Sequence, residues 1–294
     1  MITVLVGLGS ALVYGAADFF GGLAARRMST IFATAVAALA GLGAAAVIGL
    51  PLVGGAWSTE AVLLGMLSGV LGAIALALLY ACLAIGPMSI LSPLTAVVSA
   101  IVPLTVGLVG GDRLGLLGYI ALSLALVAVV LVGFTPSGNG ELVRGAVRPS
   151  LRGVLMAIGS GAAIGAFLVV IDQTPDDSGI VPLVLNRATS STILFAAVAI
   201  LVLTASRRGT GRVLNATRAG VLLAVTCGVL DALANAGLLL GVRLGELSVI
   251  AVLTALYPAG TIILAAVVLK ERIAVLQYVG LALAILAGAM LALG

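Results

Sequence analysis

The chain repeats part of itself 159 residues further on, and this duplication limits the folds open to it more than any other feature. Residues 60–132 align without a gap with residues 219–291, and 24 of the 73 pairs are identical. Chance identity in a chain so rich in Ala, Leu, Val and Gly would be roughly an eighth, so the match is a true repeat. Its polar landmarks are Ser89 and Ser248, Thr95 and Thr254, and Tyr119 and Tyr278. The two halves therefore share one architecture.

The composition places both copies in a lipid bilayer. Of the 294 residues, 63% are hydrophobic and 8% charged, and the mean hydropathy is +1.36. A water-soluble globular protein needs several times more charged surface. Thirteen of the 14 basic residues are Arg scattered at the ends of apolar runs, so we read the formal charge of +4 as contact with lipid headgroups and expect no nucleic-acid partner. The chain has no His, which excludes a His-ligated metal site, and we expect no metal and no cofactor.

Ten apolar runs are each long enough to cross a membrane as a helix, since a span needs about 20 apolar residues. They are residues 2–24, 31–53, 61–83, 89–109, 116–134, 153–171, 181–203, 219–242, 247–269 and 274–293. The widest interruption, residues 135–152, contains Pro136, Gly138, Asn139 and Gly140, a composition typical of a flexible connection. The sequence therefore predicts a first five-helix repeat over 1–134, a linker over 135–152 and a second five-helix repeat over 153–294.

An odd number of spans in each copy has a geometric consequence. The second copy must enter the membrane from the opposite face, so the halves are related by a pseudo-two-fold axis in the membrane plane. We therefore predict an all-α integral membrane protein built from two inverted repeats. Inverted repeats are typical of carriers that work by alternating access, although duplication can also simply enlarge a helix bundle.

A short acidic-Arg-aliphatic signature follows the fourth span of each copy. It reads Asp112-Arg113-Leu114 in the first copy and Glu271-Arg272-Ile273 in the second. In this signature, in length and in five-plus-five organisation, the whole chain resembles the EamA-like ten-helix members of the drug/metabolite transporter (DMT) superfamily. The resemblance implies a transporter of small metabolites or drugs, often an exporter, with a central cavity formed mainly by spans 1, 3, 4, 6, 8 and 9. The two signature pairs are themselves expected to anchor loops rather than to gate.

The distribution of basic residues predicts the orientation. The odd-numbered loops hold eleven basic residues, whereas the even-numbered loops hold Arg113, Arg187 and Arg243. By the positive-inside rule, both termini should lie on the outer side of the cell (plasma or inner) membrane. Members of the similar family usually have both termini in the cytoplasm, so the chain departs from them here. Whether it is a monomer or a homodimer stays undetermined.

The first candidate functional residue is Asp231, near the middle of the eighth span. A charge facing lipid there would cost roughly 3 kcal/mol or more, so intramembrane carboxylates usually face a cavity. Asn235 lies one turn later on the same helix face, and the repeat places Gly72 and Leu76 at the equivalent positions. We expect Asp231 to bind a substrate amine or to couple transport to protons, with a structural hydrogen bond to a neighbouring helix as the alternative.

Asp18 in the first span is the second candidate. Tyr14 lies four residues earlier on the same helix face, and Tyr80 of the third span is a candidate neighbour. Asp18 could lie well inside the membrane or reach a wet vestibule, because Arg26 begins the following loop about two turns later. A functional and a structural role are equally compatible with its position.

Polar residues and prolines in the fourth and ninth spans form a third group. Thr95, Ser99, Thr254 and Tyr257 are the candidate lining of the pathway, and Pro93, Pro103 and Pro258 lie among them. A mid-span proline frees a backbone carbonyl and bends the helix, which is tolerated where a neighbour or cavity water satisfies the freed group. For each hydroxyl taken singly, a bond to the preceding turn is the simpler interpretation.

The leading hypothesis is a secondary active transporter of a small-molecule substrate, driven by protons or by exchange. No Gly-rich phosphate loop ending in Gly-Lys-Ser/Thr is present that could couple it to nucleotide hydrolysis. Two other classes stay open: a non-transporting accessory or structural membrane subunit, and an intramembrane enzyme. An enzyme is not expected, because the chain lacks a His and clustered nucleophiles.

Overall fold

The computed structural model describes the chain in six stretches, which cover most of both repeats. They are residues 2–25, 27–85, 88–133, 150–207, 216–270 and 274–293. Within them, the side chains of 80–85, 88–90, 92, 93, 133, 205–207, 265, 292 and 293 are not described. Most of the predicted linker 135–152 lies outside these stretches.

Every element in the described stretches is helical. In the first half they are α1 (Ile2–Ala25), α2 (Thr30–Gly43), the π-helix η1 (Ala44–Gly49), α3 (Leu50–Val53), α4 (Thr59–Ile85), α5 (Met88–Gly110) and α6 (Leu116–Gly133). In the second half they are α7 (Leu151–Asp172), the 3-10 turn η2 (Asp176–Ser178), α8 (Val181–Arg207), α9 (Arg218–Leu244), α10 (Leu247–Thr254), α11 (Tyr257–Val268) and α12 (Val275–Leu293).

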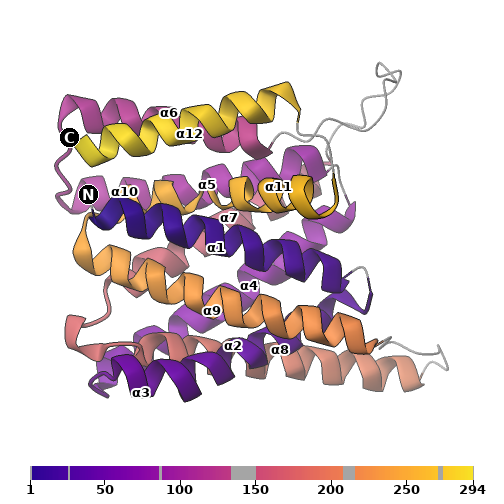
Figure 1. Cartoon of the computed structure of the whole chain (residues 1–294). Helices are drawn as coiled ribbons and strands as arrows, with labels where there is room; N and C mark the ends of the chain where they lie inside the picture. Colours follow the sequence, from indigo (N-terminus) through magenta and orange to yellow (C-terminus); the bar gives the residue numbers. More distant parts are fainter. Residues whose placement is uncertain are drawn as a thin grey trace.

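The expected fold class is confirmed. Seven helical segments of the described chain are long and apolar enough to span a membrane, and three shorter apolar helices, 94–110, 116–132 and 275–291, account for the remaining predicted runs. The start of α1 and the end of α12 lie at the same end of the bundle (Figure 1). We call this end the even-loop end, because the even-numbered loops lie there, and the other the odd-loop end.

The prolines affect the two related spans differently. The ninth span is interrupted after Thr254 and resumes at Tyr257, directly before Pro258. The fourth span carries Pro93 and Pro103 yet forms one continuous helix, α5. The expected disruption by proline is therefore seen as a break only in the second copy.

Contacts between helices follow an exchange of the two halves. α1 packs along α9, and its counterpart α7 packs along α4. α5 packs on α7, as α10 and α11 pack on α1. α8 packs on α4, as α2 packs on α9. α6 and α12 pack on each other at one edge of the bundle (Figure 1). Each pairing has the counterpart that a pseudo-two-fold relation between five-helix halves requires.

Glycines allow the closest of these helix contacts. Gly65 and Gly69 of α4 face the backbone of α8 at Pro182 and Asn186. Small residues spaced by four on one helix face let membrane helices approach closely, and this glycine pair allows α4 and α8 to do so.

Gly69→Ala should lower the thermal unfolding midpoint of the detergent-purified protein by several degrees. The added Cβ would lie 2.6 Å from the Asn186 carbonyl oxygen, an overpacking that costs about 1–3 kcal/mol. Gly9→Ala in α1 is the matched control, because its Cβ would meet nothing within 4 Å. Since Ala is the better helix former, the control should match or exceed the wild-type midpoint. Equal midpoints for the two variants would contradict the assigned packing.

Candidate functional site

A cavity of about 260 Å³ lies between the two halves of the bundle. Its wall combines residues of α1, α2, α4, α5, α7, α8, α9 and α10, and it includes Tyr257 at the start of α11. The volume is close to the lower end of the roughly 300–1,000 Å³ of small-molecule sites. The lining is mainly apolar, with a few polar groups, as small-molecule sites usually are.

Asp231 lies in this wall and is held by two groups. Its carboxylate forms an ion pair with Arg187 of α8, with Nη2 and Oδ2 2.5 Å apart. Asn235 donates from Nδ2 to the Asp231 backbone oxygen at 2.8 Å and to Oδ1 at 3.3 Å. The side chains of Arg187 and Asp231 are 14% and 27% exposed, so the pair is largely withdrawn from water. A buried pair of this kind is stable only while both partners are present.

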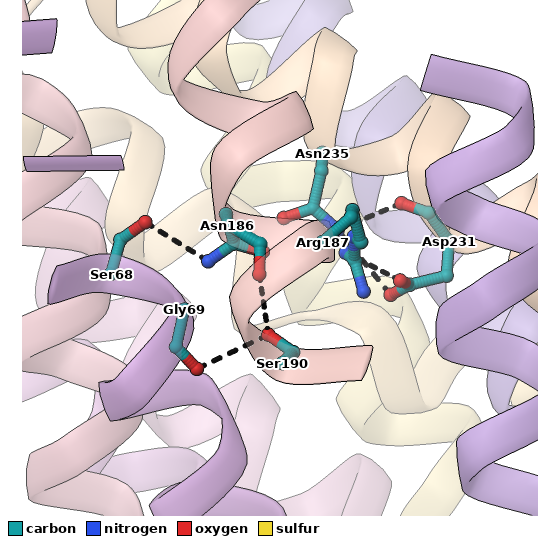
Figure 2. Close-up of polar contacts among 7 residues, drawn as sticks. All are labelled: Ser68, Gly69, Asn186, Arg187, Ser190, Asp231 and Asn235. Atoms are coloured by element: carbon teal, nitrogen blue, oxygen red, sulfur yellow. Dashed lines mark hydrogen bonds and ion pairs between the residues drawn. The ribbon is translucent and has the colours of Figure 1, made fainter. Parts of the chain in front are cut away.

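Arg187 is positioned by its neighbours on α8, which are turned toward α4 (Figure 2). Asn186 donates from Nδ2 to the Ser68 hydroxyl at 3.0 Å. The Ser190 hydroxyl is shared between two carbonyl oxygens, that of Asn186 on its own helix at 2.7 Å and that of Gly69 on α4 at 3.1 Å. These contacts fix the rotation of α8, and Arg187 then points away from α4 toward Asp231 (Figure 2). The position of the guanidinium in the cavity wall is therefore set by hydrogen bonds of its uncharged neighbours, Asn186 and Ser190.

Asp18 faces the same cavity but is exposed rather than buried. Tyr14, one turn earlier, and Tyr257 also line the cavity. Among the described residues, no hydrogen bond or ion pair involves the Asp18 carboxylate. The two predicted carboxylates thus share one cavity, where Asp231 is neutralised and Asp18 is not.

The structure separates the other predicted residues. Ser99 and Thr254 line the cavity; the Ser99 hydroxyl donates to the Ala96 carbonyl oxygen at 2.9 Å, whereas the Thr254 hydroxyl has no partner in the described part of the chain. Thr95 does not line it, because its fully buried hydroxyl is directed at the carbonyl oxygens of Leu91 and, on α7, Ala157. Tyr80 belongs to α4, but its side chain lies outside the described residues.

The assignment of Arg187 to an even-numbered loop, made from the sequence, is wrong. Arg187 lies inside α8, two turns from the start of the helix, so it is no topology signal. The sequence does contain an indication of this role: Arg187 lies within the otherwise apolar run 181–203, and a charged residue inside a span usually pairs with an opposite charge. Removing Arg187 from the even-numbered loops leaves Arg113 and Arg243 there, which sharpens the charge difference between the two ends.

The cavity is closed toward the even-loop end. Leu168, Leu238 and Ala251 line it and also belong to a buried apolar cluster that continues toward that end through Leu183 and Ile250. In the opposite direction, the lining reaches the last turn of α1 and the first residue of α2. The cavity therefore approaches the odd-loop end only.

Arg243 braces the closed end. From the last turn of α9 it donates to the carbonyl oxygens of Gly179 and Pro175, at 2.9 and 3.2 Å, and to the Ser178 hydroxyl at 2.9 Å. The same loop meets the loop after α3, where Ala56 donates to the Asp177 carbonyl oxygen at 2.8 Å. These bonds connect the apolar cluster to the two loops that cover it.

Asp112 performs the anchoring expected of the signature. Its Oδ2 accepts from the Ser248 backbone N–H at 3.0 Å and from the Ser248 hydroxyl at 2.6 Å, at the first turn of α10. A carboxylate at a helix N-terminus satisfies free N–H groups and opposes the helix dipole. The second copy of the signature, Glu271-Arg272, lies outside the described residues.

Comparisons with known proteins agree with this architecture. A comparison with curated protein sequences gives no match. A solved crystal structure superposes with a TM-score of 0.75 at 15% sequence identity, covering 99% of this chain and 96% of that one, which shows a shared fold. Residues 151–293 match the model of the EamA-like transporter family. The resemblance seen in the sequence motifs is confirmed for the second half of the chain, where this match lies, and residues 60–132 of the first half repeat part of the matched region.

Proposed function

We propose that the protein is a secondary active transporter that moves a small metabolite or drug by alternating access. The observation that carries this proposal is a cavity between the halves that contains charged groups, is separated from the even-loop end by a buried apolar cluster, and extends toward the odd-loop end. An intramembrane cavity with ionisable side chains is typical of a substrate or ion pathway. Inverted repeats permit a second state in which the closed and open ends are exchanged.

The orientation of the chain bears on the direction of transport. The odd-numbered loops carry eleven basic residues and the even-numbered loops two once Arg187 is assigned to α8, so we place the odd-loop end in the cytoplasm and both termini outside. The cavity would then be loaded from the cytoplasm in this state, which favours export. A reporter fused after Gly294 that is active only in the cytoplasm would contradict this orientation.

Flux measurements on the purified protein in liposomes test the transport proposal. We expect saturable movement of at least one member of a panel of amino acids, amines and drugs, above that of protein-free liposomes. An imposed pH gradient would accelerate a proton-coupled carrier, and substrate preloaded on the far side would accelerate an exchanger. A correctly folded protein that moves no member under either condition would favour an accessory subunit instead.

The family also weighs against an enzyme. EamA-like proteins are transporters, and the cavity contains carboxylates, hydroxyls and Cys227 but no His that could activate one of them as a nucleophile. No group of three or more metal ligands occurs among the described residues. The arrangement supports binding and passage rather than bond cleavage.

A further inference from the structure

The two long walls of the cavity differ in chemistry although they come from equivalent helices. The α1 and α9 pair in one wall corresponds to the α7 and α4 pair in the other, and the two pairs make few contacts with each other. Five aligned pairs have both members in the cavity lining, and two of them, Gly21 with Phe167 and Leu79 with Leu238, are apolar on both sides. The other three each combine a polar with an apolar residue: Asp18 and Ile164, Asp231 and Gly72, and Asn235 and Leu76. In each of these three pairs the polar member belongs to α1 or α9. One wall is therefore charged, and the opposite wall is apolar.

The cavity contains two carboxylates, Asp18 and Asp231, but one guanidinium among its described residues, that of Arg187. Arg187 neutralises Asp231 at 2.5 Å, which leaves the Asp18 carboxylate without a partner among the described residues. The Asp18 side chain is exposed within the cavity, so a ligand can reach it, and a bound cation would pair with its carboxylate in surroundings that are otherwise mainly apolar. The Thr254 hydroxyl, 7% exposed and also unpartnered in the described residues, adds an acceptor for an N–H donor in the same cavity.

The apolar wall is built for a hydrocarbon or aromatic body. Leu76 of α4 and Ile164 and Phe167 of α7 line the cavity there, and neither helix contributes a charged residue to the lining. An apolar ligand body is stabilised against this wall because its surface is removed from water there. A substrate with one charged end can contact both walls favourably only if its other end is apolar.

We propose that the cavity selects a small amphipathic amine, whose ammonium group binds Asp18 and whose apolar body lies against the α4 and α7 wall. This substrate class rests on the proposed transport function of the same cavity. A carboxylate on the ligand is disfavoured, because it would lie with two Asp side chains while the only cavity Arg of the described residues is engaged by Asp231. The cavity thus distinguishes an amine from the corresponding amino acid.

Four probes with one benzyl body and different head groups test the charge preference: phenethylamine, phenylalanine, phenylacetate and 2-phenylethanol. Binding to the purified full chain is measured by isothermal titration calorimetry. We expect phenethylamine to bind at least tenfold more tightly than each of the others. Comparable affinity for phenylalanine, tighter binding of phenylacetate, or binding of none of the four would each overturn the proposal.

Variants of the apolar wall test the orientation of the ligand. Leu76→Ala should weaken phenethylamine binding about tenfold and leave the weaker binding of methylamine unchanged, because methylamine has no apolar body. Leu67→Ala is the matched control on α4, since Leu67 is 46% exposed on the outer surface and does not line the cavity. An equal effect of Leu76→Ala on both amines would overturn the assigned orientation.

Binding and flux together separate this proposal from the transport function. Phenethylamine that binds selectively but does not cross liposomes would support the substrate class and contradict transport. Flux of phenylalanine without flux of phenethylamine would support transport and contradict the substrate class.

Discussion

Arg187→Met and Asp231→Asn should each destabilise the protein, and the double variant should be more stable than either. Each single change leaves one charge of the ion pair without its partner in the cavity wall. Breaking a fully buried pair costs about 3–5 kcal/mol; we expect about 2–4 kcal/mol here, because the Asp231 side chain is 27% exposed. The double variant leaves no charge unpaired. Unfolding of purified protein by sodium dodecyl sulfate in mixed micelles gives the four free energies of the double-mutant cycle.

Asn235→Ala provides the control for this cycle. It removes two hydrogen bonds to Asp231 but leaves the ion pair, so its cost should be about 1 kcal/mol. If the free energy of unfolding of the double variant were no higher than that of the less stable single variant, Arg187 and Asp231 would not stabilise each other.

The scaffold could be predicted from the sequence because its causes are repeated and local. Runs of about 20 apolar residues permit only helices in a bilayer, and five runs in each copy fix the relation between the halves. The span over residues 181–203, for example, corresponds to α8, which begins at the predicted residue and continues to Arg207. A bend near Pro258 was also expected, and the structure has a break there, since proline cannot donate the hydrogen bond that would continue the helix.

The site could be predicted only in part, because its contacts join distant segments. The single intramembrane carboxylate of each candidate helix indicated Asp18 and Asp231. Nothing local indicated which of them Arg187 would neutralise, since this depends on the rotation of α8 that Asn186 and Ser190 set against α4. Thr95 shows the same limit: it aligns with Thr254, yet it bonds to α7 and is absent from the cavity wall.

Asp18→Asn should lower the binding and the low-concentration transport of an amine by roughly 10- to 100-fold. The free energy of unfolding should stay within about 0.5 kcal/mol of the wild type, because Asp18 is exposed and has no partner among the described residues to lose. Asn keeps the shape of the side chain but removes the only cavity carboxylate among the described residues that lacks a partner. Loss of one charge-assisted hydrogen bond costs about 1.5–3 kcal/mol, which corresponds to roughly 10- to 100-fold in affinity. Calorimetric binding, liposome flux and detergent unfolding are measured on the same preparations.

The comparison between the two carboxylates makes this result specific. Asp18→Glu, which keeps the charge, should retain part of the flux, whereas Asp231→Asn should lose stability because it leaves Arg187 unpaired. The same chemical change therefore separates the two residues: at position 18 it lowers transport by a stable protein, and at position 231 it weakens the protein itself. Undiminished flux by Asp18→Asn would remove Asp18 from the mechanism and leave the ion pair as the only charged element of the site.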